Sequence, residues 1–196
     1  MAVRWKTLLA VGLLSGSAWA GEATTWKESD FAMYPQYCRA RLDNKNKLMI
    51  PVWEKKIGAA SFLHVHHYCF GMKAVALAYA NYTDKNRRRF FANATVSETA
   101  YFLEHAPEES PLRAEVLVTQ GRGFVLADQP DDARERFEAA LEIDPNLVDA
   151  WAFLSDVHVA QGRKQEAIKV LQDARDKLGD QKKIMLRLKE LGVSAG

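Results

Sequence analysis

One pattern of residues occurs twice, about 34 positions apart, between residues 114 and 180. Large, small and alanine positions follow one another in the same order in both copies. The matched pairs are Leu117 and Trp151, Gly121 and Ser155, Phe124 and His158, Ala133 and Ala167, Phe137 and Leu171, and Ala140 and Ala174. A period of this length is typical of a solenoid built from helix-turn-helix units. The sequence therefore predicts an all-α protein whose repeats stack side by side.

Local signals predict where the helices of each copy begin and end. Pro130 suits the first turn of a helix, where its missing amide hydrogen costs nothing. Gly162 suits a position just after a helix end. Residues 128–131 and 161–163 are therefore the expected turns within the two units. One unit cannot bury its own apolar face, so neighbouring units are expected to stack.

Residues 114–180, about a third of the chain, resemble the tetratricopeptide repeat family. The resemblance implies a scaffold that binds a protein or peptide on the concave face formed by the first helix of each repeat. Carried over by register, that face comprises Glu115, Val118, Arg122, Val125, Leu126, Asp149, Ala152, Asp156, Val159 and Ala160. It lacks the lysine and asparagine pair with which family members clamp a C-terminal carboxylate. The expected ligand is an extended or helical peptide laid along the groove.

Residues 61–113 are expected to form a long helical hairpin and a degenerate repeat. Apolar side chains recur at spacings of three and four from Phe62 to Tyr79, which predicts a helix with Ser61 as its N-cap. Asp84 is expected to cap the next helix, which runs to about His105. Phe90, Leu103, Ala106 and Pro111 lie about 34 residues before Phe124, Phe137, Ala140 and Pro145.

The C-terminal residues 181–196 are expected to close the array. Ile184, Leu188 and Leu191 share one helix face, and lysines occupy the other. Repeat arrays need such a helix, with a polar outer face, to keep their last unit soluble.

The first twenty residues are predicted to be a secretory signal peptide. Arg4 and Lys6 precede a short apolar run, and residues 18–20, Ala-Trp-Ala, form a small-x-small cleavage site before Gly21. The run of about 13 residues is shorter than the ~20 that a membrane-spanning helix needs. We therefore expect a periplasmic or secreted protein without stable membrane insertion after cleavage.

Charge argues against nucleic-acid binding. The chain has 27 Lys and Arg against 25 Asp and Glu. Cleavage after Ala20 removes two cations, Arg4 and Lys6, and no acid, which leaves 25 of each sign. A formally neutral chain lacks the basic surface by which proteins bind phosphate backbones.

Residues 21–60 are expected to be an irregular segment of short helical turns that wraps over the first long helix. An exported chain with two cysteines, Cys38 and Cys69, is expected to pair them in a disulfide. The other interpretations are a redox-active pair, disfavoured by the wide spacing, and metal thiolates.

Residues 64–69 contain His64, His66, His67 and Cys69, which predicts either a metal or haem site or a set of structural histidines. On a helix His64 pairs with His67, and His66 with Cys69. At about 100° per residue these two pairs point to nearly opposite sides. This favours structural histidines that are buried beside tyrosines and hydrogen-bonded to the wrapping segment. No cofactor is expected.

Two short segments carry a second resemblance. The Tyr37-Cys38-x-Ala40-Arg41 and His66-His67-Tyr68-Cys69-x-Gly71 segments resemble the N-terminal part of uncharacterised exported bacterial tetratricopeptide repeat proteins. That resemblance implies no activity.

No enzyme motif is present: the sequence has no nucleophile elbow, phosphate loop or paired-carboxylate motif. Residues 86–89, Asn-Arg-Arg-Arg, could bind an anion or form a solvated helix face. The sequence thus predicts a non-enzymatic scaffold for a protein or peptide partner, and the alternative is a metal- or haem-binding protein that uses the histidine segment.

Overall fold

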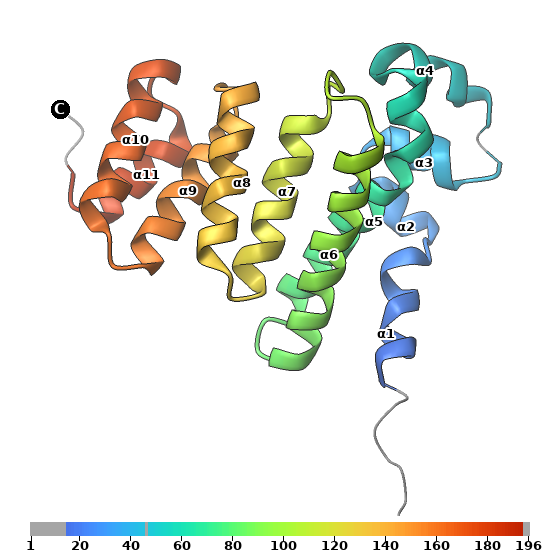
Figure 1. Ribbon diagram of the computed structural model, residues 1–196, viewed down its shortest axis with the longest axis horizontal. Coiled ribbons are helices and arrows are strands. Elements are labelled where there is room, and N and C mark those ends of the chain that lie inside the picture. Colours follow the sequence, from blue (N-terminus) through green and yellow to red (C-terminus); the bar gives the residue numbers. More distant parts are fainter. Residues whose placement is uncertain (1–14, 46, 194–196) are drawn as a thin grey trace, which may run out of the picture.

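The computed structural model describes residues 15–45 and 47–193, and every regular element in these residues is a helix. The elements are α1 (Ser15–Thr24), α2 (Glu28–Met33), α3 (Gln36–Leu42), the 3₁₀ helix η1 (Lys47–Met49), α4 (Ile50–Ile57), α5 (Ala59–Ala80), α6 (Lys85–His105), α7 (Arg113–Leu126), α8 (Pro130–Ile143), α9 (Val148–Ala160), α10 (Lys164–Leu178) and α11 (Lys182–Glu190). Figure 1 shows α5 to α11 stacked in one row, with α1 to α4 gathered beside α5 at one end. The predicted all-α solenoid is confirmed.

The turns within the two repeats share one backbone conformation. Asp128, between α7 and α8, has a φ of 65°, and Gly162, about 34 residues later between α9 and α10, has a φ of 74°. Glycine adopts this left-handed conformation freely, and aspartate tolerates it better than most residues. Pro130 begins α8, as the sequence predicts.

Complementary side-chain sizes let the two helices of each repeat approach. A Cβ atom placed on Gly121 of α7 would lie 2.6 Å from Cε1 of Phe137 on α8, a ring that is fully buried. In the next repeat the equivalent positions are Ser155 and Leu171. In the first repeat the large ring of Phe137 thus faces Gly121, which has no side chain. In the second repeat the smaller Leu171 occurs together with Ser155, which has one. Ala133 and Ala167, at a second matched position, are also fully buried.

The N-terminal hairpin, α5 and α6, departs from the repeat spacing. Asp84 caps α6 by accepting hydrogen bonds from the backbone amides of Asn86 (3.1 Å) and Arg87 (3.0 Å), as expected. The predicted N-cap Ser61 is wrong, because α5 begins at Ala59 with Gly58 as its cap. The degenerate register is also wrong at Phe90. Its expected counterpart Phe124 lies in α7, the first helix of a pair, whereas Phe90 lies in α6, the second helix of a pair. No helix-breaking residue interrupts residues 85–105, so α6 is one continuous helix.

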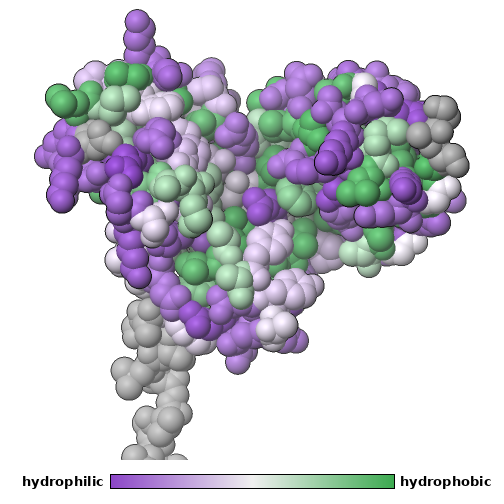
Figure 2. Space-filling view, turned by 180° about the vertical axis from the view of Figure 1, so that it is seen from behind, coloured by the Kyte–Doolittle hydropathy of each residue, from purple (hydrophilic) through white to green (hydrophobic). Residues whose placement is uncertain are grey.

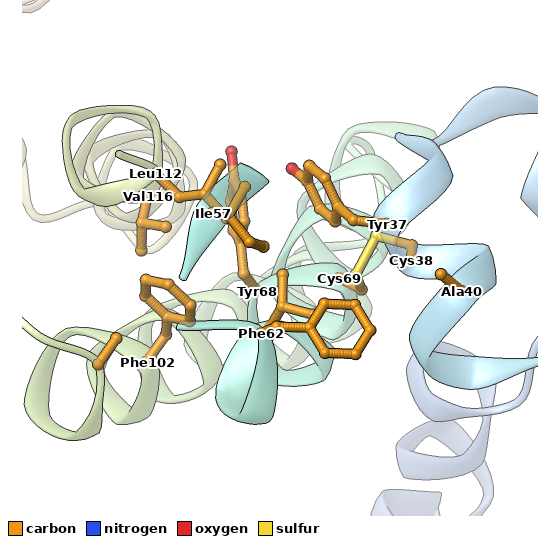
Figure 3. Close-up of a cluster of buried hydrophobic side chains, with 12 residues drawn as sticks. Tyr37, Cys38, Ala40, Ile57, Phe62, Tyr68, Cys69, Phe102, Leu112 and Val116 are labelled. Carbon is orange, nitrogen blue, oxygen red and sulfur yellow. A yellow bond between two sulfur atoms is a disulfide. The ribbon is translucent and has the colours of Figure 1, made fainter. Parts of the chain in front are cut away.

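A disulfide and a buried lysine link the segment before α5 to α5 itself. Cys38 of α3 and Cys69 of α5 are bonded, in a core that includes Tyr37 and Phe62 (Figure 3). The predicted disulfide is therefore present. The buried Lys73 of α5 donates a hydrogen bond to the carboxylate of Asp30 (2.8 Å). Burial acts to raise the pKa of Asp30, but its hydrogen bonds to Lys73 and to a backbone amide bring it below its ordinary value.

Helix α1 packs on the same hairpin. The guanidinium of Arg87 donates to both carboxylate oxygens of Glu22, at 2.7 and 2.8 Å, and Trp19 packs edge-on against Phe90. The predicted cleavage site after Ala20 lies within α1, and residues 1–14 of the predicted signal peptide lie outside the described residues. No helix in the described part of the chain has both the length and the apolar character needed to cross a bilayer.

Helix α11 closes the other end. Ile184 and Leu188 are buried against Leu171 and Ala174 of α10 and against Ala152 of α9. The helix therefore covers the apolar face that the last repeat would otherwise expose, as the sequence predicts for residues 181–196.

Candidate functional site

The first helices of successive pairs are α5, α7 and α9. Helix α7 contacts both α5 and α9, and the three line a groove on one side of the row. Figure 2 views the molecule from behind and shows this side hollowed between the N-terminal and C-terminal helices, with hydrophobic and hydrophilic surface mixed inside the hollow. Stacked helix pairs form concave surfaces of this kind because each pair is rotated slightly on the last.

Two cavities occupy this groove. The first, of about 400 Å³, is lined by Tyr79 of α5, by Arg122 and Val125 of α7, by Phe153, Asp156, Val157 and Ala160 of α9, and by Asp128 and Pro130. The second, of about 370 Å³, is lined by Tyr68, Met72, Glu115, Val118, Thr119, Arg122, Asn146, Leu147, Val148 and Asp149. Arg122 lines both cavities, so the two adjoin at its side chain. The wall of the first cavity is mostly apolar, whereas the second has polar and apolar surface in about equal parts. Apolar walls with a few charged groups are usual in binding sites.

The side chain of Arg122 is held between aromatic rings of two neighbouring helices. Its guanidinium carbon lies 5.2 Å from the ring centroid of Tyr79 on α5 and 5.4 Å from that of Phe153 on α9. Cation–π contacts at such distances contribute about 0.5–2 kcal/mol each. Within the described residues no carboxylate forms an ion pair with Arg122. The rings therefore fix the guanidinium in the groove without neutralising its charge.

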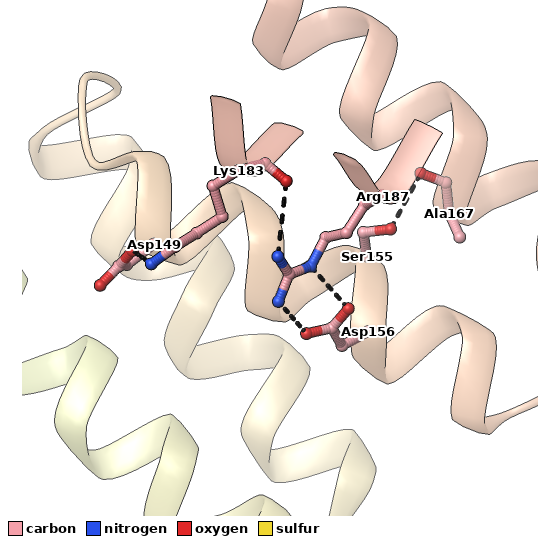
Figure 4. Close-up of polar contacts among 6 residues, drawn as sticks. All are labelled: Asp149, Ser155, Asp156, Ala167, Lys183 and Arg187. Carbon is pink, nitrogen blue, oxygen red and sulfur yellow. Dashed lines mark hydrogen bonds and ion pairs between the residues drawn. The ribbon is translucent and has the colours of Figure 1, made fainter. Parts of the chain in front are cut away.

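The two aspartates of α9 in the groove are instead paired with the capping helix. Arg187 of α11 donates to both carboxylate oxygens of Asp156, at 2.7 and 2.8 Å, and Lys183 forms an ion pair with Asp149 (Figure 4). The hydrogen bond to Asp156 raises the pKa of Arg187. These contacts neutralise the acidic wall from within the chain, as does the pairing of Asp128 with Arg88 at 2.9 Å.

Glu115 lies at the other end of α7, about 10 Å along the helix axis from Arg122. Removal from water raises the pKa of its carboxyl group, and the nearby Asp144 raises it further. This end of the groove therefore disfavours added negative charge.

Seven of the ten residues carried over by the repeat register line the cavities: Glu115, Val118, Arg122, Val125, Asp149, Asp156 and Ala160. The other three lie elsewhere. Leu126 is 2% exposed, in a core with Phe91, and Ala152 is fully buried beneath α11. Val159 is exposed but lines neither cavity. Leu126 and Ala152 were wrongly assigned to the surface, because the register alone does not show which neighbouring helix covers a position.

Sequence reasoning missed Tyr79 and Phe153, the two rings around Arg122. The groove positions were assigned only within residues 114–180, so α5 was not included as a wall of the groove. Phe153 follows Ala152 by one residue on α9, and that 100° step turns its side chain from the buried face toward the groove. An aromatic residue beside predicted groove positions was the available signal.

The histidine segment lies on α5, where it packs against α6. The Nδ1 atom of His67 lies 2.7 Å from a carboxylate oxygen of Glu98, and its ring stacks on Tyr101, which in turn stacks on His105. The tyrosine contact was expected, but the hydrogen-bond partner comes from α6 and not from the wrapping segment. Burial lowers the pKa of His66 to about 4, with further lowering by His67.

The proposed metal ligands do not converge. The sulfur of Cys69 is bonded to Cys38 and is therefore not a free thiolate. Within residues 15–45 and 47–193, no group of three or more histidine, cysteine or acidic side chains is placed to hold a metal ion. The alternative of a site formed by His64, His66, His67 and Cys69 is therefore not supported by the geometry. Two of the three arginines at 87–89 are likewise engaged, Arg87 by Glu22 and Arg88 by Asp128.

Stacked antiparallel helix pairs with a mixed apolar and charged groove define the chain as a helical-repeat protein. Residues 124–190 match the tetratricopeptide repeat family, from the last turn of α7 to the end of α11. Over these residues the helices are similar to tetratricopeptide repeats, which in general are protein–protein interaction modules. A comparison with curated proteins finds no match to the chain.

Proposed function

We propose that this protein is an exported, non-enzymatic scaffold that binds a protein or peptide segment in the groove of α5, α7 and α9. The observation that carries the proposal is the pair of adjoining cavities, about 400 and 370 Å³, lined by the first helices of successive repeats. A row of cavities along stacked helices suits an extended or helical peptide, because such a ligand offers side chains at regular intervals.

The chemistry of the groove also supports recognition. Its charged side chains are one arginine held by aromatic rings and several acidic groups, of which three are already paired within the chain. Apolar side chains make up much of the remaining wall. Such a surface offers contact area and a charge for orientation, as interfaces between proteins do.

Export is supported by the N-terminal sequence and by the disulfide. Residues 1–20 have the pattern of a secretory signal, and disulfides persist mainly in oxidising compartments. We expect the mature chain to begin at Gly21. The intact mass of the protein purified from the envelope or medium of its native cells tests this part, and a chain that still carries Met1 would contradict it.

Site-specific photocrosslinking tests the binding proposal. A benzophenone amino acid replaces either Val125, which is 42% exposed in the groove, or Ile143, which is 51% exposed at the end of α8 and lines neither cavity. In native cells we expect a discrete adduct from position 125 that disappears when Arg122→Glu is added, and none from position 143. Equal adducts from both positions, or an adduct indifferent to Arg122, would contradict a ligand in this groove.

A further inference from the structure

We propose that the ligand of this groove presents an acidic side chain to Arg122, with an apolar side chain beside it. The inference rests on the proposed function and names the chemistry of the bound segment: an Asp or Glu within a peptide of another protein. Charge complementarity with the groove is the observation that carries it.

The two aspartates that line the first cavity with Arg122 already form ion pairs within the chain, whereas Arg122 does not. Asp156 accepts two hydrogen bonds from Arg187, and Asp128 accepts from Arg88. No described carboxylate pairs with Arg122, so the centre of the groove keeps one positive charge. A desolvated carboxylate placed there would gain a charge-assisted interaction at a site already shaped by protein side chains.

The geometry of the guanidinium suits a carboxylate. Tyr79 and Phe153 contact it through their rings, and its Nε atom is buried without a hydrogen-bond partner. The terminal N–H groups are therefore the polar surface available to a ligand. An arginine restrained in this way is pre-organised for planar, bidentate pairing with a carboxylate.

The side chains around Arg122 indicate which kind of ligand residue lies next to the acidic one. The exposed faces of Tyr79 (41%) and Val125 (42%) and the side chain of Ala160 provide an apolar wall next to Arg122. The second cavity continues past Arg122 toward Glu115. The peptide therefore extends on both sides of the carboxylate, so the acid is a side chain within the segment and not its C-terminus.

A peptide selection on the folded, full-length protein tests the inference. Phage-displayed random dodecapeptides are selected in parallel on the wild type and on Arg122→Met, which keeps an apolar side chain between the rings but removes the charge. The Asp156→Lys change is avoided because it would also break the contact with Arg187. Thermal unfolding checks that both proteins are folded.

The wild type is expected to enrich peptides with an Asp or Glu next to an aromatic or aliphatic residue, and Arg122→Met is expected to lose the acidic preference. For one enriched peptide, measured by fluorescence anisotropy, replacing its acid by the matching amide should weaken binding to the wild type at least about tenfold. The same replacement should change binding to Arg122→Met by less than about twofold, since the cation it pairs with is absent.

The outcomes separate the two proposals. Peptides that crosslink at position 125 but carry no acidic preference, or that bind Arg122→Met equally well, would overturn the acidic-ligand inference and leave the groove as a binding site. A selection that yields no peptide dependent on the groove would count against both proposals.

Discussion

Replacing Gly121 by alanine tests how the repeat interior is packed. The new Cβ would lie 2.6, 2.8 and 2.9 Å from three ring atoms of Phe137. That ring is fully buried in a core with Ala133, Ala140 and Leu154, so it cannot move into solvent. Alanine in a helix interior is favoured over glycine by about 1 kcal/mol. Overpacking a buried site costs about 1–3 kcal/mol. We therefore expect Gly121→Ala to lower the free energy of unfolding by about 1 kcal/mol, or the Tm by about 2–4 °C.

A second substitution should rescue this loss. Phe137→Leu places a leucine opposite position 121, as Leu171 is placed in the repeat where serine replaces the glycine. Urea denaturation followed by circular dichroism, on both single variants and the double variant, should show that the double variant is about 1 kcal/mol more stable than additivity predicts.

Gly123→Ala is the matched control, because its Cβ would contact Thr95 and Val96 and not Phe137. The change in the free energy of unfolding caused by Gly123→Ala should therefore be the same with and without Phe137→Leu. If Gly121→Ala stabilised the protein by the full helix-propensity gain, or if the two changes were additive, the packing argument would be refuted.

Three further predictions concern the ends of the array and its histidines. Cys38→Ser should destabilise the protein by about 3–4 kcal/mol, because the disulfide closes a 31-residue separation; thermal unfolding with and without reductant measures it, and equal Tm values in the two conditions for the wild type would contradict it. Deleting residues 181–196 should uncover Leu171 and cause aggregation, visible by light scattering; a monomer of unchanged stability would contradict the capping role. The depressed pKa of His66, about 4 against an ordinary 6.5, means that the unfolded chain takes up this proton first as pH falls. The wild type should therefore lose stability between about pH 6.5 and 4 more steeply than His66→Asn, and parallel pH profiles of the Tm would contradict the assignment.

The helix pairs α7 to α10 could be predicted from the sequence because their limits depend on local signals. Pro130 starts one helix, and Gly162 takes the left-handed conformation after another. The same reasoning failed at Phe90, where the repeat spacing was extended into a helix that has no breaker. Spacing identifies a repeat only where turn residues recur with it.

The candidate site was predictable only in part, because it depends on contacts between distant segments. The register gave Arg122 and Val125, whose faces follow from α7 alone. It did not show that α11 buries Ala152 and pairs with Asp156, because that depends on how residues about 30 positions later pack back onto α9. The histidine segment shows the same limit, since the carboxylate that contacts His67 and the tyrosine that stacks on its ring come from α6.

Hydrogen exchange measured by mass spectrometry tests most directly the claim that α5, α7 and α9 form a binding groove. The full chain is compared with and without a peptide selected on the wild type. We expect slower exchange in the segments around Tyr79, Arg122 and Phe153, and less of this slowing in Arg122→Met at the same peptide concentration. The outer helices α6, α8 and α10 should exchange at unchanged rates beyond their contacts with the groove. Protection centred on those outer helices, or on the segment before α5, would contradict the account.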